Sequence, residues 1–384
     1  MIAQRLIVIL TLLCSISIAV GSETQPIALR IATFNIEDVR SSDLDGADNE
    51  RLKAIAEVIQ RLRPNVLLLN ELAVHQGDGP SNAQKFVFNY LAVSQGEGLR
   101  PITYDTYTPP TNTGVHSGFD LDNSGSIQAS VPEQQDGKQT PEQRAYGNDS
   151  FGFGTFPGQY GMALLVHPKL KIHRDQIRTF QQFLWKDLPG HTAPLSEDDS
   201  SWYSDDEWAV MRLSSKNFVD VPIQLPNGTD LHALISHPTP PAFDGEEKRN
   251  VLRNHDEIGL IRAYIDGEET LYDDAGNKGG LGADAHFVIL GDLNADPSDG
   301  GSVEMTIFSQ LFASERLAQD THPGSSIRID DLDRTDTARF GLRVDYVLPS
   351  AGIMVSESGI WREVGYRARF PSDHFPVWAE VIVP

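Results

Sequence analysis

The chain has 384 residues, of which 31 are lysine or arginine and 54 are aspartate or glutamate, so its formal net charge is −23 at pH 7. Such an acidic surface repels polyanions at long range, and the sequence has no cluster of basic residues, so nucleic acid is disfavoured as a partner without being excluded. One cysteine cannot form an intramolecular disulfide, and a chain of this length can bury a large core without one.

Residues 1–21 have the features of a secretory signal peptide. Arg5 is their only charged residue, residues 6–20 form a mostly apolar run, and small residues precede the expected cleavage point. The run is short for a membrane-spanning helix, so an uncleaved anchor is only the alternative. We therefore expect a secreted or periplasmic protein whose mature part, residues 22–384, does not insert stably into a membrane.

The first predicted elements form a strand–helix–strand unit. Residues 27–34 alternate between apolar and polar side chains, as a half-buried strand does. Residues 50–63 have apolar side chains at the spacing of one helix face, and Pro64 ends that helix. Residues 66–69 are entirely apolar, which predicts a buried strand and, with the preceding elements, a layered arrangement of helices and sheets.

Two insertions interrupt the later elements. Residues 73–157 and 187–208 are rich in small and polar side chains and have weak periodicity, which is typical of functional or irregular loops. Helices are predicted at 257–265 and in part of 303–313. Further strands are predicted at 162–166, 218–223, 231–236, 287–290, 344–348 and 377–382. Many strands with few helices predict an α+β fold of two packed mixed sheets with outer helices, and residues 22–384 are interpreted as a single domain.

Polar side chains follow the ends of several predicted strands. Asn35 and Glu71 each come directly after or at the end of an apolar run. Asp292 and Asn294 are two residues apart, so in an extended chain their side chains point to the same side. A carboxylate is a strong ligand for Mg²⁺, Mn²⁺ or Ca²⁺, and an Asn amide can bind a cation or donate to a phosphate oxygen. The sequence therefore predicts a site for a hard divalent cation and a phosphate ester.

Two histidines are further candidates for the site. His374 lies in Ser-Asp-His at 372–374 and is the best candidate for a group that exchanges a proton near neutral pH. His237 follows the strand predicted at 231–236.

Taken together, these motifs resemble the endonuclease/exonuclease/phosphatase superfamily of metal-dependent phosphoesterases. Gly-Asp-Leu-Asn at 291–294 and Ser-Asp-His at 372–374 are the most specific pieces of the resemblance. The other matching positions, in the expected order, are Asn35, Glu71, His237 and Asp345. The resemblance covers about residues 27–384 and implies a four-layered α-β-β-α sandwich with the site at one edge of the two sheets.

The resemblance implies how the metal is held. Glu71 matches the principal metal ligand, and Asp373 matches a ligand of the metal or of its bound water. We assign Asn35 to the metal as well as to the substrate phosphate. Mg²⁺ is the expected ion, with Mn²⁺ and Ca²⁺ as alternatives, because magnesium typically takes one or two carboxylates and keeps several waters.

The resemblance also implies catalytic roles. Asp292 matches a residue that positions the attacking water or binds a second metal, and Asn294 matches one that contacts the scissile phosphate. Asp345 matches the partner of His374. His237 matches a residue that protonates the leaving oxygen or holds a phosphate oxygen. Either Asp292 or His374 could be the general base.

Three features keep two interpretations each. Tyr160 either lies near the substrate phosphate or packs as a strand-end aromatic. Residues 238–243 form a proline-rich loop that is either a wall of the substrate site or a rigid turn that packs its phenylalanine on the core. Residues 119–125 resemble the start of a calcium loop, but Val131 stands where the closing glutamate is expected, which favours a solvated loop.

Hydrolysis of a phosphate ester by water attack on phosphorus is the function that the sequence supports best. The acidic charge favours a small molecule or a lipid head group as substrate. A secreted nuclease is the alternative, and a non-catalytic recognition module on the same fold is a third hypothesis. The sequence gives no indication of a protein partner.

Overall fold

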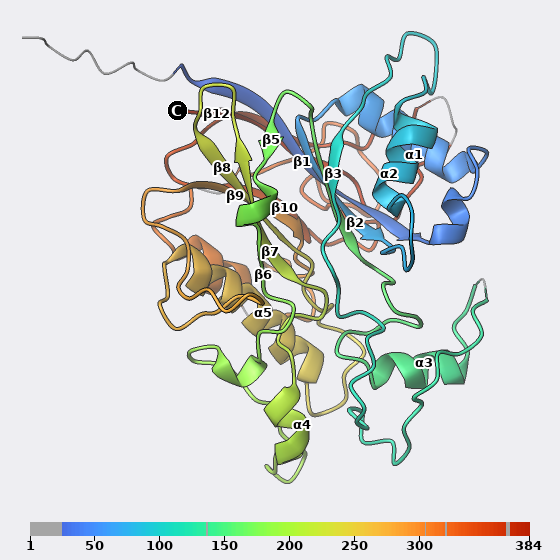
Figure 1. Cartoon of the computed structure of the whole chain (residues 1–384), viewed down its shortest axis with the longest axis vertical. Helices are drawn as coiled ribbons and strands as arrows, with labels where there is room; N and C mark the ends of the chain where they lie inside the picture. The colour runs from blue at the N-terminus through green and yellow to red at the C-terminus, as the bar shows by residue number, and fades with distance from the viewer. Residues whose placement is uncertain (1–24, 136, 304, 319–320, 366–368) are drawn as a thin grey trace, which may run out of the picture.

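A computed structural model describes residues 25–384 except 136, 304, 319–320 and 366–368, so the predicted signal peptide lies outside the described residues. Two mixed sheets of six strands each pack face to face, and helices lie on their outer sides (Figure 1). The arrangement confirms the predicted α+β class and the α-β-β-α order of layers.

The first sheet has the strand order β11-β12-β1-β2-β4-β3. Its members are β1 (Ile27–Val39), β2 (Val66–Leu72), β3 (Asp105–Tyr107), β4 (Met162–Val166), β11 (Met354–Ile360) and β12 (Val377–Val383). β1 and β2 are parallel, and the other neighbours are antiparallel.

The second sheet has the order β10-β9-β8-β7-β5, with β6 also paired to β7. Its members are β5 (Lys171–Ile172), β6 (Arg178–Thr179), β7 (Phe218–Gln224), β8 (Asp230–Ser236), β9 (His286–Asp292) and β10 (Asp345–Pro349). Here β8 and β9 are the parallel pair.

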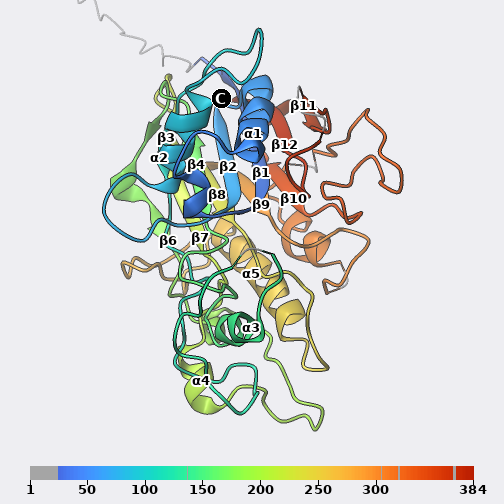
Figure 2. The same cartoon turned by 90° about the vertical axis from the view of Figure 1, so that its right-hand side faces the viewer.

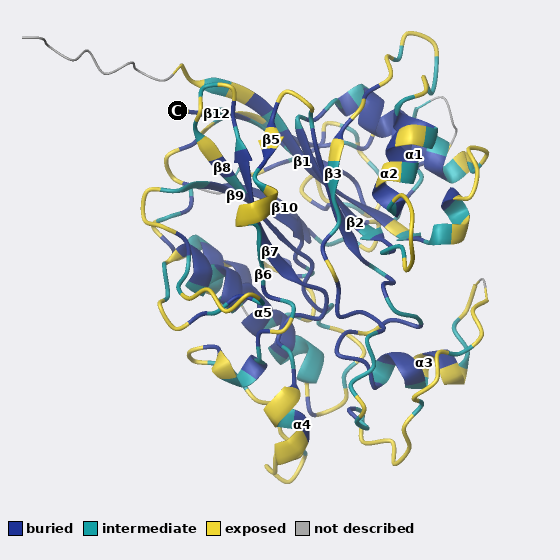
Figure 3. Cartoon of the chain, viewed as in Figure 1, coloured by how far each residue is buried: buried dark blue, intermediate teal, exposed yellow. Residues whose placement is uncertain are grey.

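Strand alternation divides the buried apolar side chains between two cores. In β9, Val288 and Leu290 belong to the core between the sheets, whereas Phe287 and Ile289 belong to the core under α5 (Arg249–Ile265). Successive side chains of a strand point to opposite faces, so a strand covered on both faces is apolar throughout. Each large apolar side chain that is fully buried in this way contributes about 1.5–3 kcal/mol to the stability of the fold. Figure 3 shows the central strands of the sheets as buried, in dark blue.

Helix α1 (Glu50–Leu62) covers the first sheet with the predicted apolar face. Its N-cap Asn49 accepts hydrogen bonds from the backbone N–H groups of Arg51 and Leu52. Arg63 adopts a left-handed conformation and ends the helix before Pro64. None of the described helices combines the length and the apolarity that crossing a bilayer requires.

The insertions contain more regular structure than the sequence indicates. The short elements are α2 (Asn82–Phe86), a π-helical turn (Val87–Leu91), α3 (Pro141–Asn148) and α4 (Asp205–Val210), with β3 also inside the first insertion. The remaining helical turns are Ser41–Leu44, Arg174–Gln176, Trp185–Asp187 and Ile307–Phe312. Both views place α3 and α4 at the same end of the molecule, away from α1 (Figure 2).

Two elements differ from prediction for identifiable reasons. Helix α5 begins at Arg249 rather than at residue 257, because the Asp244 carboxylate accepts the backbone N–H groups of Asn250 and Val251 and so stabilises a polar first turn. Strand β11 is missed because it lies at a sheet edge, where only its last two residues are buried and its apolar pattern is weak.

A buried ion pair in the second sheet predicts a pH-dependent stability. Nδ1 of His232 lies 2.8 Å from Oδ1 of Asp220, and the Tyr264 hydroxyl donates to Oδ2 at 2.6 Å. Burial lowers the pKa of His232, but the hydrogen bond and charge of Asp220 outweigh it, so the folded-state pKa lies above the ordinary 6.5. The pair therefore contributes stability that is complete below the unfolded-state pKa and is lost as pH rises through the folded-state pKa.

We expect the urea midpoint of the wild type to fall over that pH window relative to His232→Gln, which cannot gain a proton there. The measurement is urea unfolding at a series of pH values for both proteins. Parallel midpoint curves would contradict a stabilising charge on His232.

Candidate active site

The predicted residues meet at one edge of the sandwich, where they lie on the neighbouring strands β1 and β2 and on the neighbouring strands β9 and β10. Asn35 of β1 pairs in register with Asn70 of β2, directly before Glu71. Asp292 of β9 pairs with Asp345 of β10.

Close packing of β8 against β9 sets the next position. A Cβ atom on Gly291 would lie 1.9 Å from the backbone oxygen of Ser236, so only glycine fits between the two strand ends. The pair is parallel, so the residue after β8, His237, lies beside Asp292, with its Nε2 atom 3.5 Å from Oδ2 of Asp292.

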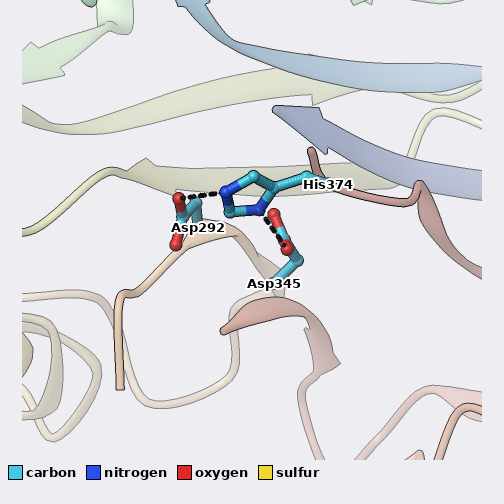
Figure 4. A group of neighbouring side chains, drawn as sticks. All are labelled: Asp292, Asp345 and His374. Carbon is cyan, nitrogen blue, oxygen red and sulfur yellow. Dashed lines mark hydrogen bonds and ion pairs between the residues drawn. The ribbon is translucent and has the colours of Figure 1, made fainter. Parts of the chain in front are cut away.

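His374 lies between two carboxylates, as Figure 4 shows. Nδ1 of His374 is 2.8 Å from Oδ2 of Asp345, and Nε2 is 3.8 Å from Oδ2 of Asp292. All three side chains are buried. A hydrogen bond to Asp345 fixes the ring orientation and aims Nε2 at Asp292. The structure thus brings together three residues, Asp292, Asp345 and His374, that come from distant parts of the sequence.

Burial and neighbouring charges shift the pKa values of the two histidines in opposite directions. Burial lowers the pKa of His374, but the charges of Asp345 and Asp292 outweigh it and raise the pKa above its ordinary value. Burial, with the positive charges of Lys216 and His374, lowers the pKa of His237 well below its ordinary value. At neutral pH the arrangement therefore holds a charged His374 and a neutral His237 on either side of Asp292.

Asp292 is a buried carboxylate with several donors around it. Burial raises its pKa, and the positive charge of His374 partly offsets this. Oδ1 accepts the backbone N–H of Asn294 at 3.0 Å, and Oδ2 accepts Nδ2 of Asn35 at 3.0 Å. A carboxylate whose pKa is raised toward neutrality is suited to proton transfer at working pH.

Asn35 joins Asp292 to Glu71. Its Nδ2 group also donates to Oε1 of Glu71 at 3.1 Å, while its Oδ1 atom accepts the backbone N–H of Glu37 at 3.0 Å. The amide nitrogen therefore faces the carboxylates. The predicted role of Asn35 as a metal ligand would use the oxygen, so the amide would have to turn over for that role.

Glu71 and its surroundings fit a divalent cation. Burial raises the pKa of Glu71, the Asn35 hydrogen bond and the charge of His374 lower it, and Asp373 adds a nearby negative charge. Within the described part of the chain, Oε2 accepts a hydrogen bond from the backbone N–H of Asp38, at 2.9 Å, and from no other group. A cation beside Glu71 and Asp373 would offset the burial of this carboxylate, and the oxygen donors suit Mg²⁺.

Asn294 and Tyr160 also lie at the site. Both have left-handed backbone conformations, with φ of 52°, and both line the cavity in front of the carboxylates. Nδ2 of Asn294 donates to the Pro238 carbonyl at 3.1 Å, which ties the loop after β8 to the loop after β9. The Tyr160 hydroxyl accepts a hydrogen bond from Nε2 of Gln139 at 3.4 Å, and burial raises its pKa.

The cavity has a volume of about 950 Å³. Both insertions contribute to its wall, through residues such as Leu121, Arg144 and Tyr203. It is large enough for a small organic molecule.

Lys216 is a cavity residue that sequence reasoning missed. It is buried, and its Nζ atom donates to the Pro238 carbonyl at 3.3 Å. Burial lowers its pKa, while the charges of Glu257, Glu71 and Asp292 act in the opposite direction. Nothing in the sequence distinguishes this lysine from a solvated one, because its surroundings come from distant segments.

A second acidic group lies in the first insertion. Carboxylate oxygens of Asp120, Asp122 and Asp149 lie within 4.8 Å of one another and could hold a cation. Backbone N–H groups of the same loop already donate to Asp120 and Asp149, as at Gly125 and Leu121. The arrangement agrees with a loop held by its own hydrogen bonds.

Comparison with known proteins assigns the fold and the family. The sequence model of the Endonuclease/Exonuclease/phosphatase family matches residues 32–374. No curated protein matches the chain. A solved endonuclease/exonuclease/phosphatase from Beutenbergia cavernae DSM 12333 is similar, with a TM-score of 0.51 and 16% identity, over 93% of this chain and 72% of that one.

Two further solved structures are similar at lower scores. A family protein from Bacteroides thetaiotaomicron has a TM-score of 0.48 and 15% identity, over 94% of this chain and 97% of that chain. A family protein from Leptotrichia buccalis C-1013-b has a TM-score of 0.48 and 14% identity, over 92% of this chain and 99% of that chain.

Proposed function

The chain belongs to the endonuclease/exonuclease/phosphatase family, whose members are metal-dependent phosphoesterases, and we propose that it hydrolyses a small phosphate ester by attack of water on phosphorus. The proposal rests on one observation. Asp292, a buried carboxylate, is surrounded by Asn35, the backbone of Asn294 and two histidines at the wall of a cavity large enough for a small molecule.

Asp292 acts as the general base in this proposal. Its carboxylate orients the attacking water and takes a proton from it. Asp345 holds His374 charged and correctly oriented, so that the imidazolium stabilises negative charge that develops on the phosphoryl oxygens. Asn294 has a second amide hydrogen beyond the one that it donates to Pro238, and this hydrogen can position those oxygens. Asn35 holds Asp292 and Glu71 in place through its amide nitrogen. The neutral His237 can donate a hydrogen bond to the leaving oxygen as the P–O bond breaks.

Glu71 and Asp373 would hold the divalent cation. When bound there, a divalent cation would neutralise charge on the phosphate and polarise a P–O bond. Mg²⁺ is the ion that this oxygen-donor set suits best. Secretion, proposed from residues 1–21, would place the enzyme outside the cytoplasm, where small phosphate esters can be scavenged.

The direct test is an assay of the chain recovered after export from a bacterial host. We expect hydrolysis of bis-p-nitrophenyl phosphate with Mg²⁺ or Mn²⁺, a loss of about 100-fold or more in chelator, and recovery on adding Mg²⁺ back. Plasmid DNA, RNA, sphingomyelin and inositol phosphates serve as comparison substrates. Turnover that is unchanged by chelation, or none with any phosphate ester, would contradict the proposal.

A further inference from the structure

Exposed phenylalanine side chains gather around the cavity of the candidate active site. Among the described residues, the phenylalanines with exposed side chains are Phe88, Phe153, Phe243, Phe308 and Phe340. Three of these five, at positions 153, 243 and 340, line this one cavity. They come from three distant segments, so their convergence is a property of the fold. Apolar side chains that gather at one exposed place mark a binding surface.

Phe340 lies directly beside the candidate catalytic residues. Its ring meets the His374 ring edge to face, with centroids 5.4 Å apart, yet the side chain is 53% exposed. The backbone N–H of Arg339 donates to the Asp373 carbonyl at 2.7 Å, which fixes this loop to the segment that carries His374. A substrate phosphate at His374 therefore places its organic group within reach of Phe340.

Phe243 is presented to solvent by a restrained loop. Its side chain is 93% exposed, so the alternative that it packs on the core is wrong. Its φ of 65° is strained for a phenylalanine. Nδ2 of Asn294 holds the Pro238 carbonyl at one end of the loop, and Nδ2 of Asn250 holds the Ala242 carbonyl at the other, at 2.8 Å. Strain that holds an apolar ring in water at a cavity mouth indicates a functional role.

Phe153 extends the same surface from the first insertion. Its side chain is 39% exposed, and its ring rests on Gly147 of α3. A Cβ atom at Gly147 would lie 2.7 Å from a carbon of this ring. The glycine thus makes room for the ring beside the helix, and because Phe153 also lines the cavity, the first insertion has a part in the site.

We propose that Phe153, Phe243 and Phe340 form a subsite for a planar aromatic group esterified to the substrate phosphate. The inference rests on the proposed function and names its substrate class. Aromatic rings favour stacked or edge-to-face contact with other rings, and the cavity is far larger than a phosphate requires.

Binding of non-hydrolysable phosphonates tests the subsite separately from turnover. The probes are methylphosphonate, butylphosphonate and phenylphosphonate, titrated by calorimetry into the chain with Mg²⁺. We expect phenylphosphonate to bind about 10-fold more tightly than methylphosphonate and several-fold more tightly than butylphosphonate. Phe243→Ala and Phe340→Ala should each reduce the phenyl preference about threefold and leave methylphosphonate binding within about twofold.

Phe243→Trp and Phe340→Trp should keep the preference for phenylphosphonate. Phe88→Ala is the matched control and should also keep it, because Phe88 is 77% exposed and lies outside the cavity wall. Thermal midpoints within a few degrees of the wild type show that each variant is folded.

The outcomes separate the two proposals. A chain that hydrolyses bis-p-nitrophenyl phosphate but binds the three phosphonates equally contradicts the subsite and leaves the proposed function standing. An unchanged phenyl preference in both alanine variants, or equal binding of butyl- and phenylphosphonate, also contradicts it. A chain that neither hydrolyses the ester nor binds any phosphonate contradicts the proposed function and, with it, the subsite.

Discussion

Asp292→Asn should lower kcat by about 10³-fold, the largest effect that we expect from a single change, because it removes the proposed base. An asparagine can still accept one hydrogen bond from Asn35 or from the backbone of Asn294, so the local geometry should persist. Burial raises the pKa of Asp292, so the ionised side chain is a destabilising group in the folded state. The variant should therefore unfold at the same or a higher temperature than the wild type.

The matched control is Asp299→Asn. Asp299 lines the same cavity and loses the same charge, but its side chain is exposed. We expect its kcat with bis-p-nitrophenyl phosphate to stay within about twofold of the wild type, since exposed charges contribute little. Near wild-type kcat in Asp292→Asn, or an equal loss in both variants, would contradict the assignment of Asp292.

Glu71→Gln should lower kcat/KM by about 10²- to 10³-fold and raise the Mg²⁺ concentration needed for half-maximal activity at least 10-fold. Glutamine keeps the length of the side chain but removes the charge that the cation would offset. The neighbouring carboxylates Asp292 and Asp373 remain, so excess Mn²⁺ should restore part of the activity. A Mg²⁺ titration of initial rates measures both effects.

Glu37→Gln is the corresponding control. Glu37 also lines the cavity, but its side chain is exposed. Its backbone N–H donates a hydrogen bond to Asn35, and its carboxylate has no part in that contact. Its Mg²⁺ dependence should match that of the wild type. If Glu71→Gln loses activity with no change in Mg²⁺ dependence, Glu71 is not a metal ligand.

Residues that follow strand ends were predictable from the sequence. Apolar runs in the sequence end at Asn35, Glu71 and Asp292, and the register of β1 on β2 and of β9 on β10 places these residues and Asp345 at one edge. Short motifs also identified His374, and the structure places it between Asp345 and Asp292.

Other parts of the site depend on contacts that no local pattern carries. Lys216 is buried and donates to the carbonyl of Pro238 in the loop after β8, a contact between segments that are distant in the sequence. The first turn of α5 has no apolar pattern that would predict it. It is stabilised by the Asp244 carboxylate, which accepts hydrogen bonds from the backbone N–H groups of Asn250 and Val251. Phe243 would ordinarily be placed in the core by its hydrophobicity, and only the tethered loop holds it outside. Tertiary context decides such positions.

One cation is expected to bind beside Glu71, at the same edge of the sandwich as Asp292 and His374. The direct measurement is anomalous scattering from a crystal soaked in Mn²⁺. We expect an anomalous peak about 2.1 Å from a Glu71 carboxylate oxygen, within reach of Asp373. A peak only among Asp120, Asp122 and Asp149, in a protein whose activity needs Mn²⁺, would contradict it.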